Sequence, residues 1–292
     1  MCTAISWKNK DSYFGRNLDL ERGYGESVVI TPRNFKLNMR LENDLDNHYA
    51  MIGMGTVIDQ FPLYFDATNE MGVSMAGLHF PDNAYYEEPK EESDRKQITP
   101  FELIPWVLGR CANLTEVREL LNQMRLVNVN FSKGLPLSPL HWMISDKEES
   151  IVLENMREGM RIYENPYQVL TNNPPFAKQQ TFIKKDMDLP GDFSSTSRFL
   201  KVYYVKENSV AEETEMSSVN QFFHILNAVS VPKGCSITED GYKYTRYSSC
   251  CNASKGIYYY QTYDKFEILT VNMHDADLDG SQLSITKTVY SL

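Results

Sequence analysis

The sequence has no long uninterrupted apolar run, and this absence limits where the protein can work. No stretch approaches the roughly 18 residues that a membrane-spanning helix needs. The first residues also lack the apolar core of a secretory signal peptide, because residues 7–12 are mostly polar where that core would lie. We therefore expect a soluble protein of the cytoplasm that has no membrane partner.

Basic residues are also few. Lys and Arg number 29 against 39 Asp and Glu, which gives a net charge of −10 at pH 7. Binding to nucleic acid needs a concentrated positive surface, so we expect no nucleic-acid partner. The five cysteines, at positions 2, 111, 235, 250 and 251, lack the spacing of a disulfide framework or a metal site. We expect reduced thiols, no metal and no cofactor.

What the sequence does contain is a series of strand-like segments. Each combines β-branched and aromatic residues and is bounded by turn signals. These segments cover residues 27–31, 49–54, 72–80, 140–145, 150–155, 160–163, 256–262, 266–272 and 282–290. Their close spacing favours antiparallel meanders over alternating βαβ units.

Helices are fewer, and the sequence predicts them in two pairs. Thr99 predicts the start of the first helix, and Asn113 predicts the start of the second, which runs to about residue 125. A third helix is predicted over residues 195–206, and Ser218 predicts the start of a fourth.

Strand runs flanked by paired helices predict a layered α+β sandwich, in which helix pairs cover the outer faces of stacked sheets. We expect one domain over residues 1–292. The segments 82–95 and 177–192 are rich in charged residues and predict surface excursions, because neither is long enough to link two domains.

The most informative chemistry lies at the start of the chain. If Met1 is removed, Cys2 offers a thiol and a free α-amine on one residue. An α-amine has an ordinary pKa of about 7.7 to 8.0, so near neutral pH it can accept the proton of the thiol. Arg16 and Asp19 follow three residues apart, and an irregular strand end could bring both to the terminus. Arg16 would favour a thiolate and Asp19 would hold the amine.

The surrounding motifs resemble the choloylglycine hydrolase family, which comprises bile salt hydrolases and penicillin V acylases. They run in family order through nearly the whole chain, at residues 1–3, 14–19, 30–34, 50–55, 76–78, 140–146, 170–174, 189–193, 197–199 and 255–260. The resemblance implies the four-layer αββα fold of N-terminal nucleophile hydrolases. It also implies that autocatalysis or a peptidase exposes Cys2, which then hydrolyses a non-peptide amide.

The resemblance also implies roles for individual residues. Cys2 attacks the amide carbon, Asn172 donates to the oxyanion, and Arg198 braces the site, while Arg16 and Asp19 orient and activate the nucleophile. An oxyanion donor of this kind is typically worth about 100-fold to 1000-fold in rate. Contacts with the acyl group are expected from apolar residues near the Cys2 end of the fold: Leu20, Phe61, Tyr64, Phe131 and Leu135.

Two features depart from the family pattern. His79 stands where bile salt hydrolases usually show Asn and penicillin V acylases usually show Tyr. A histidine could still donate to the oxyanion through one ring nitrogen. The segment between Asn172 and Arg198 is shorter than in typical relatives, where it reaches a neighbouring subunit. We expect a homo-oligomer, although this segment does not support a tetramer.

The predicted substrates are glycine- or taurine-conjugated bile acids, with penicillin V or an acyl-homoserine lactone as the alternative. A papain-like pair of Cys111 and His141 is less favoured, because both residues have the sequence context of packing residues. Residues 275–280 begin like an EF-hand calcium loop, but the twelfth position is Thr286 instead of Glu. We expect an acidic turn there.

Overall fold

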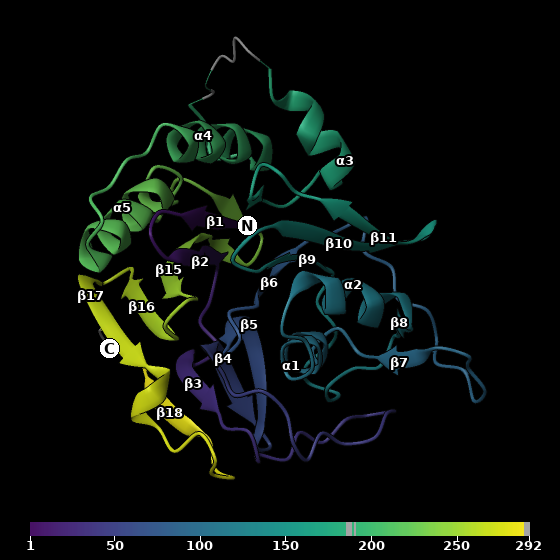
Figure 1. Ribbon diagram of the computed structural model, residues 1–292. Helices are drawn as coiled ribbons and strands as arrows, with labels where there is room; N and C mark the ends of the chain where they lie inside the picture. The colour runs from purple at the N-terminus through teal and green to yellow at the C-terminus, as the bar shows by residue number, and fades with distance from the viewer. Residues whose placement is uncertain (185–188, 190, 289–292) are drawn as a thin grey trace.

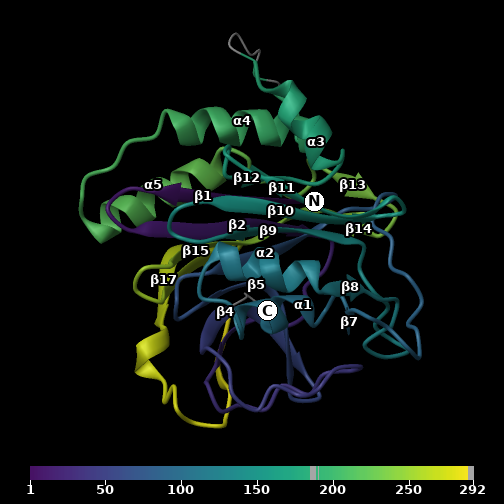
Figure 2. The ribbon, with the colours of Figure 1, turned by 45° about the vertical axis from the view of Figure 1, so that its right-hand side comes forward.

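Two stacked β-sheets form the centre of the molecule, and helices cover both outer faces, as Figure 1 and Figure 2 show from two sides. The computed structural model describes residues 1–184, 189 and 191–288. The layers follow the order helix, sheet, sheet, helix. This is the αββα fold that the resemblance implies, so the predicted fold class is confirmed.

The sheet that carries the amino terminus has six antiparallel strands. In spatial order they are β12 (Val169–Leu170), β1 (Cys2–Lys8), β2 (Ser12–Leu20), β15 (Tyr244–Asn252), β16 (Ile257–Thr262) and β17 (Lys265–Asn272). β1 therefore lies inside the sheet, with β12 on one side and β2 on the other. A terminal strand that is paired on both sides is well ordered, and its first residue is Cys2.

The second sheet has eight antiparallel strands. They are, in spatial order, β11 (Gly159–Glu164), β10 (Ser150–Met156), β9 (Leu140–Ser145), β6 (Ser74–His79), β5 (Phe61–Asn69), β4 (Met51–Ile58), β3 (Ser27–Thr31) and β18 (Ser284–Lys287). Two short pairs lie outside both sheets: β7 (Lys96–Ile98) with β8 (Met124–Leu126), and β13 (Ile237–Thr238) with β14 (Gly241–Tyr242).

The helices α4 (Ser195–Glu207) and α5 (Glu215–Asn227) cover the six-stranded sheet, whereas α1 (Leu103–Leu108) and α2 (Leu114–Asn122) lie on the eight-stranded side (Figure 2). A short helix α3 (Phe176–Gln179) and 3-10 turns at Gln180–Phe182 and Met273–Asp275 complete the described elements. Asn113 caps α2 as predicted, since its side chain accepts a hydrogen bond from the main-chain nitrogen of Glu116 at 3.0 Å. None of the helices in the described ranges could cross a membrane.

A fully buried carboxylate links the two sheets. Asp66 of β5 accepts hydrogen bonds from the hydroxyls of Tyr247 (2.6 Å), Tyr258 (2.6 Å) and Ser249 (3.2 Å), which all belong to the other sheet. Burial raises the pKa of Asp66, although Arg16 and the three hydroxyls act in the opposite direction. The three donors satisfy a buried polar group that would otherwise be costly, so they help to fix one sheet on the other.

Most predicted strands are confirmed, but the predicted segments leave out several central strands, among them β5 and β15. β5 contains Pro62 and Asp66, and β15 contains Ser248 and Ser249, so neither has the apolar pattern of a buried strand. Asp66, Ser248 and Ser249 are buried and form hydrogen bonds with side chains of neighbouring strands or of the facing sheet. Their polarity is satisfied by long-range contacts, which a local pattern cannot show.

Two predicted helix starts were wrong. α5 is capped by Thr214, and Ser218, the predicted cap, lies inside the helix and is buried. α1 begins one turn later than expected, because the Thr99 hydroxyl donates to the Glu102 carboxylate at 2.7 Å before the helix starts. The predicted caps were therefore in the right segments but at the wrong positions.

The predicted surface excursions differ in their structure. Residues 82–95 are mostly exposed, as expected. The segment 177–192 contains the end of α3 and a 3-10 turn, and its residues 185–188 and 190 lie outside the described residues. The last predicted strand, 282–290, is observed as β18 over 284–287, and its residues 289 and 290 are also outside the described part.

We expect Asp66→Ala to lower the free energy of unfolding by about 2 to 4 kcal/mol, because three buried hydroxyls lose their common acceptor. Urea titration followed by fluorescence would measure the change. Tyr258→Phe removes one of the three hydrogen bonds and should cost less, about 1 kcal/mol. Equal stabilities of Asp66→Ala and the wild type would contradict the role of this carboxylate.

Candidate active site

Cys2 is buried at the first position of β1, with 2% of its surface exposed. β1 and β2 pair so that Cys2 lies opposite Leu18 and Ala4 lies opposite Arg16. Opposed side chains share a face and successive ones alternate, so Cys2 and Arg16 face the second sheet, whereas Asp19 points toward α4. Arg16 and Asp19 therefore approach the terminus from opposite faces. β2 is regular against β1, whereas its pairing with β15 shifts register between Thr245 and Tyr247, beside Asp19.

The guanidinium of Arg16 is fully buried between the sheets. Its Nη1 donates to the carbonyl oxygens of Phe65 (2.8 Å) and Gly77 (2.6 Å), which belong to β5 and β6. Within the described part of the chain, its Nε and Nη2 have no hydrogen-bond partner. Two neutral carbonyls hold this cation without neutralising it, so its charge acts on the nearby thiol.

The thiol of Cys2 has a lowered pKa. Burial alone would raise it, but the Arg16 guanidinium and the positive amino terminus together hold the pKa of Cys2 below its ordinary value. A backbone hydrogen bond from Asp19 acts in the same direction, while the Asp19 carboxylate opposes it. More of the sulfur is therefore present as thiolate, which is the nucleophilic form.

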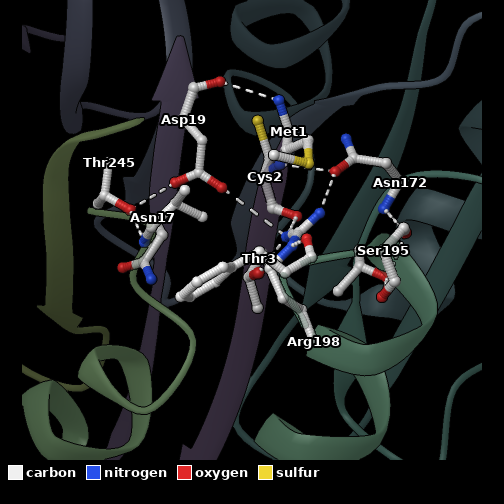
Figure 3. A network of polar contacts seen from close by, with 12 residues as sticks. Met1, Cys2, Thr3, Asn17, Asp19, Asn172, Ser195, Arg198 and Thr245 are labelled. Atoms are coloured by element: carbon white, nitrogen blue, oxygen red, sulfur yellow. Dashed lines mark hydrogen bonds and ion pairs between the residues drawn. The ribbon is translucent and has the colours of Figure 1, made fainter. Parts of the chain in front are cut away.

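On the other face of β1, Arg198 of α4 connects the groups around Cys2 (Figure 3). Its Nη1 donates to the carbonyl oxygen of Cys2 (2.6 Å) and to Thr3 Oγ1 (2.7 Å), and its Nη2 donates to Asn172 Oδ1 (2.8 Å). The same Nη1 lies 3.8 Å from Asp19 Oδ2. One buried cation thus links β1, β2 and Asn172, which lies just beyond β12.

Asn172 stands just beyond β12, which places it beside the start of β1. Its Oδ1 accepts a hydrogen bond from the Cys2 main-chain nitrogen at 2.6 Å, and its Nδ2 donates to the His79 carbonyl oxygen at 2.7 Å. The Asn172 main-chain nitrogen donates to Ser195 Oγ at 2.8 Å. Both ends of the side-chain amide are therefore held, which is the preorganisation that an oxyanion donor requires.

Met1 closes the site in this structure (Figure 3). Its amino group donates to the Asp19 carbonyl oxygen at 2.9 Å, and its own carbonyl oxygen accepts from the Asp19 main-chain nitrogen at 3.0 Å. Burial lowers the pKa of the Met1 amine. With Met1 attached, the nitrogen of Cys2 is a peptide N–H that donates and cannot take up a proton.

The Asp19 carboxylate is the acidic group of the site. Its Oδ1 accepts a hydrogen bond from Thr245 Oγ1 at 2.7 Å. Its Oδ2 faces Arg198 and has no hydrogen-bond partner among the described residues. An acceptor oxygen is therefore available near the terminus to hold an ammonium group.

His79 is half-buried at the end of β6. Burial, together with the nearby amino terminus and Lys243, lowers the pKa of His79 to about 4. The ring is therefore neutral at pH 7 and carries one N–H, so it can donate one hydrogen bond. The structure brings His79 to Asn172 through its carbonyl oxygen, which supports the expectation that both residues lie at one site.

The five expected acyl contacts are divided between two cores. Phe61, Tyr64 and Phe131 are buried in the core next to α1 and α2, and the ring centroids of Phe61 and Phe131 are 6.2 Å apart. Leu135 packs against the same core, whereas Leu20 packs against the core that contains Cys2. Contact between these residues and an acyl group stays a prediction.

A cleft of about 190 Å³ opens directly after β2. It is lined by Leu20, Glu21, Arg22, Tyr24 and Asp240. Sequence reasoning identified Leu20 and missed the other four. Their position in the sequence could have identified them, because the residues after Asp19 leave the end of β2 next to the amino terminus.

The papain-like alternative has no support in the structure. Burial raises the pKa of the Cys111 thiol to about 12. His141 Nδ1 is paired with Glu154 and its Nε2 with the carbonyl oxygen of Thr171. Both ring nitrogens are therefore engaged elsewhere, and Cys111 is an inert packing residue.

The calcium-loop alternative rested on residues 275–280. In the structure, Asp279 Oδ1 accepts a hydrogen bond from Arg33 Nη1 at 2.7 Å, so this carboxylate belongs to an ion pair. No group of three or more His, Cys, Asp or Glu side chains in the described ranges could hold a metal ion.

Comparison with known proteins places this geometry in context. A family model described as linear amide C–N hydrolases, choloylglycine hydrolase family, matches residues 2–187 and 184–286. A bile salt hydrolase/transferase from Lactiplantibacillus plantarum is 46% identical, with 97% of this chain and 95% of the relative covered. A bile salt hydrolase/transferase from Clostridium perfringens is 34% identical, with coverage of 98% and 97%.

Solved structures agree with this comparison. A mutant conjugated bile acid hydrolase from Clostridium perfringens superposes with a TM-score of 0.89 at 32% identity, covering 99% of this chain and 97% of that chain. A penicillin V acylase from Agrobacterium tumefaciens gives a TM-score of 0.80 at 19% identity, covering 97% and 90%, and shows the shared fold.

We expect Arg16→Gln to slow alkylation of Cys2 at pH 7 by about tenfold or more, because loss of the buried cation raises the pKa of the thiol. The pH profile of iodoacetamide labelling, followed by peptide mass at Cys2, should move to higher pH. Arg95→Gln, which changes an exposed arginine, is the matched control. Identical profiles for Arg16→Gln and the wild type would refute the electrostatic role of Arg16.

Proposed function

This chain belongs to the choloylglycine hydrolase family of linear amide C–N hydrolases, and from that premise we propose that it hydrolyses glycine- or taurine-conjugated bile acids. The observation that carries the proposal is the buried network in which Cys2, Asn172 and Arg198 meet at the start of β1. Similarity to the two bile salt hydrolase/transferase relatives over nearly their full lengths supports this choice of substrate.

In the proposed reaction, the Cys2 thiolate attacks the carbon of the substrate amide. Once Met1 has been removed, the α-amine of Cys2 takes up the thiol proton and delivers it to the departing amine. Asn172 and the neutral ring of His79 donate to the oxyanion that develops on the amide oxygen. One such donor typically raises the rate by about 100-fold to 1000-fold. Glycine or taurine leaves, and the bile acid remains as a thioester on Cys2.

Hydrolysis of the thioester completes the cycle. A water molecule loses its proton to the same α-amine and attacks the thioester carbon, and the sulfur of Cys2 departs as a thiolate. Arg16 stabilises that thiolate, because its charge lies on the same face of the sheet. Asp19 and Arg198 keep the terminus in place through both steps.

The acyl group is proposed to contact Leu20, Phe61, Tyr64, Phe131 and Leu135. Leu20 also lines the cleft after β2, and this supports its place in the substrate site more directly than that of the other four. An apolar pocket contact changes discrimination between substrates by about 1 to 3 kcal/mol.

An acylase acting on penicillin V or on acyl-homoserine lactones is the second candidate. His79 is the observation that keeps it open, because this residue matches neither the Asn of bile salt hydrolases nor the Tyr of penicillin V acylases. The nucleophile and the base would be the same, so the two candidates differ only in the acyl group and the leaving amine.

We further infer a homo-oligomer in the cytoplasm, with a small-molecule amide as substrate and no nucleic-acid partner. The acidic net charge of −10 supports the last of these statements. The shorter segment between Asn172 and Arg198 supports an assembly other than the family tetramer.

We expect the purified protein to release glycine or taurine from conjugated bile acids at least about tenfold faster than it releases phenoxyacetate from penicillin V. Amine release measured by mass spectrometry would compare the substrates under one condition. Cys2→Ala is the blank, because it removes the nucleophile and little packing. Activity on penicillin V alone would overturn the bile acid proposal and leave the acylase candidate.

Retention of Met1 should abolish activity, with a loss of at least about 100-fold, because an acylated nitrogen cannot serve as the base. Two ubiquitin fusions cut by one deubiquitinase would release matched chains that begin at Met1 or at Cys2. Intact mass would confirm each terminus before the hydrolysis assay. Comparable activity of the two chains would contradict the role of the α-amine.

A further inference from the structure

A buried ionisable pair lies beneath the oxyanion donors and has no part in the reaction described above. His141 at the start of β9 and Glu154 of β10 are both fully buried. His141 Nδ1 lies 3.1 Å from Glu154 Oε1, and His141 Nε2 lies 2.7 Å from the carbonyl oxygen of Thr171. The histidine ring also stacks on Phe80, with a centroid distance of 4.2 Å and an angle of 6°.

These contacts reach the two chain segments that form the site. Thr171 immediately precedes Asn172, and Phe80 immediately follows His79. The two segments meet where Asn172 Nδ2 donates to the His79 carbonyl oxygen. One rigid ring therefore holds one segment by a hydrogen bond and the other by stacking.

The hydrogen-bond partners fix the orientation of the histidine ring. The Thr171 carbonyl oxygen can only accept, so His141 Nε2 donates to it. Glu154 Oε1 shares a hydrogen bond with His141 Nδ1 and also accepts from the Phe176 main-chain nitrogen at 2.8 Å. The Glu154 side chain is therefore held by the main chain and holds the histidine ring in turn.

The advantage of this buried pair is geometric. Hydrogen bonds at both nitrogens of His141 fix the direction of the ring, and the stacking contact with Phe80 fixes one of its faces. Glu154 thus keeps the His141 ring in the position from which Nε2 reaches the Thr171 carbonyl oxygen.

We propose that His141 and Glu154 are a positioning pair that sets the oxyanion donors Asn172 and His79 at the correct distance from Cys2. This inference rests on the proposed function, since it assigns an oxyanion to the site. The pair reaches the site through Thr171 and Phe80, and Glu154 also holds the Phe176 main-chain nitrogen.

The direct test is Glu154→Gln. The amide oxygen of Gln can keep both hydrogen bonds that Glu154 Oε1 accepts, so the shape is conserved. The acidic group beside His141 Nδ1 is lost, so the hydrogen bond between the two side chains weakens. The segment that carries Thr171 and Asn172 is then held less firmly.

Two rates distinguish a positioning role of the pair from a general loss of structure at the site. Hydrolysis of the best amide substrate needs the oxyanion donors, whereas alkylation of Cys2 by iodoacetamide needs only the thiolate. We expect Glu154→Gln to lower kcat by about 10-fold to 100-fold, with KM and the alkylation rate changed by less than about threefold. Glu149→Gln makes the same chemical change in a carboxylate paired with Arg118 at the surface, and should alter neither rate.

A second variant keeps the test decisive if Glu154→Gln does not fold. Phe80→Leu removes the stacking partner, leaves both hydrogen bonds of His141, and should again lower kcat selectively. An unchanged kcat, or a parallel fall of kcat and alkylation in the folded variants, would overturn the proposal. Failure of the bile acid proposal is recognised separately, because it is seen in the substrate preference of the wild type.

Discussion

The pairing of β1 between β12 and β2 is the constraint on which the site depends. β12 pairs with Ala4 and Ile5 of β1, and β2 pairs with β1 from Cys2 onward, so Cys2 stands at the end of a strand that is held on both sides. The same pairing brings Asn172 beside Cys2, because Asn172 is the second residue after β12. The positions of Cys2 and Asn172, the proposed nucleophile and oxyanion donor, therefore follow from strand register, and the side-chain hydrogen bonds refine a geometry that the backbone provides.

Two buried arginines act on this terminus from opposite faces of one sheet. Arg16 lies between the sheets, where carbonyl oxygens of the facing strands hold it, and its charge lowers the pKa of the Cys2 thiol. Arg198 lies on the helix side and binds the carbonyl oxygen of Cys2 and the side chain of Asn172. The alternation of side chains along β1 and β2 thus separates an electrostatic role from an orienting role.

The sequence was sufficient for the αββα fold, through its family resemblance, and for the positions of several helices, because helices depend on local signals. Asn113 could be recognised as a cap since its partner Glu116 is three residues away. β5 and β15 could not be recognised, because the polar residues within them are satisfied by distant strands. For the same reason, the opposite faces of Arg16 and Asp19, and the residues around the cleft after β2, required three-dimensional structure.

The strand order also has a consequence for synthesis of the protein on the ribosome. The outer neighbour of β1 is β12, near residue 170, and the neighbour of β2 is β15, which ends at Asn252. At about 5 to 20 residues per second, the nascent chain waits on the order of ten seconds or more before β15 emerges. During that interval the finished sheet cannot enclose Met1 and Cys2, and the hydrogen bonds that surround them in the folded chain are still incomplete.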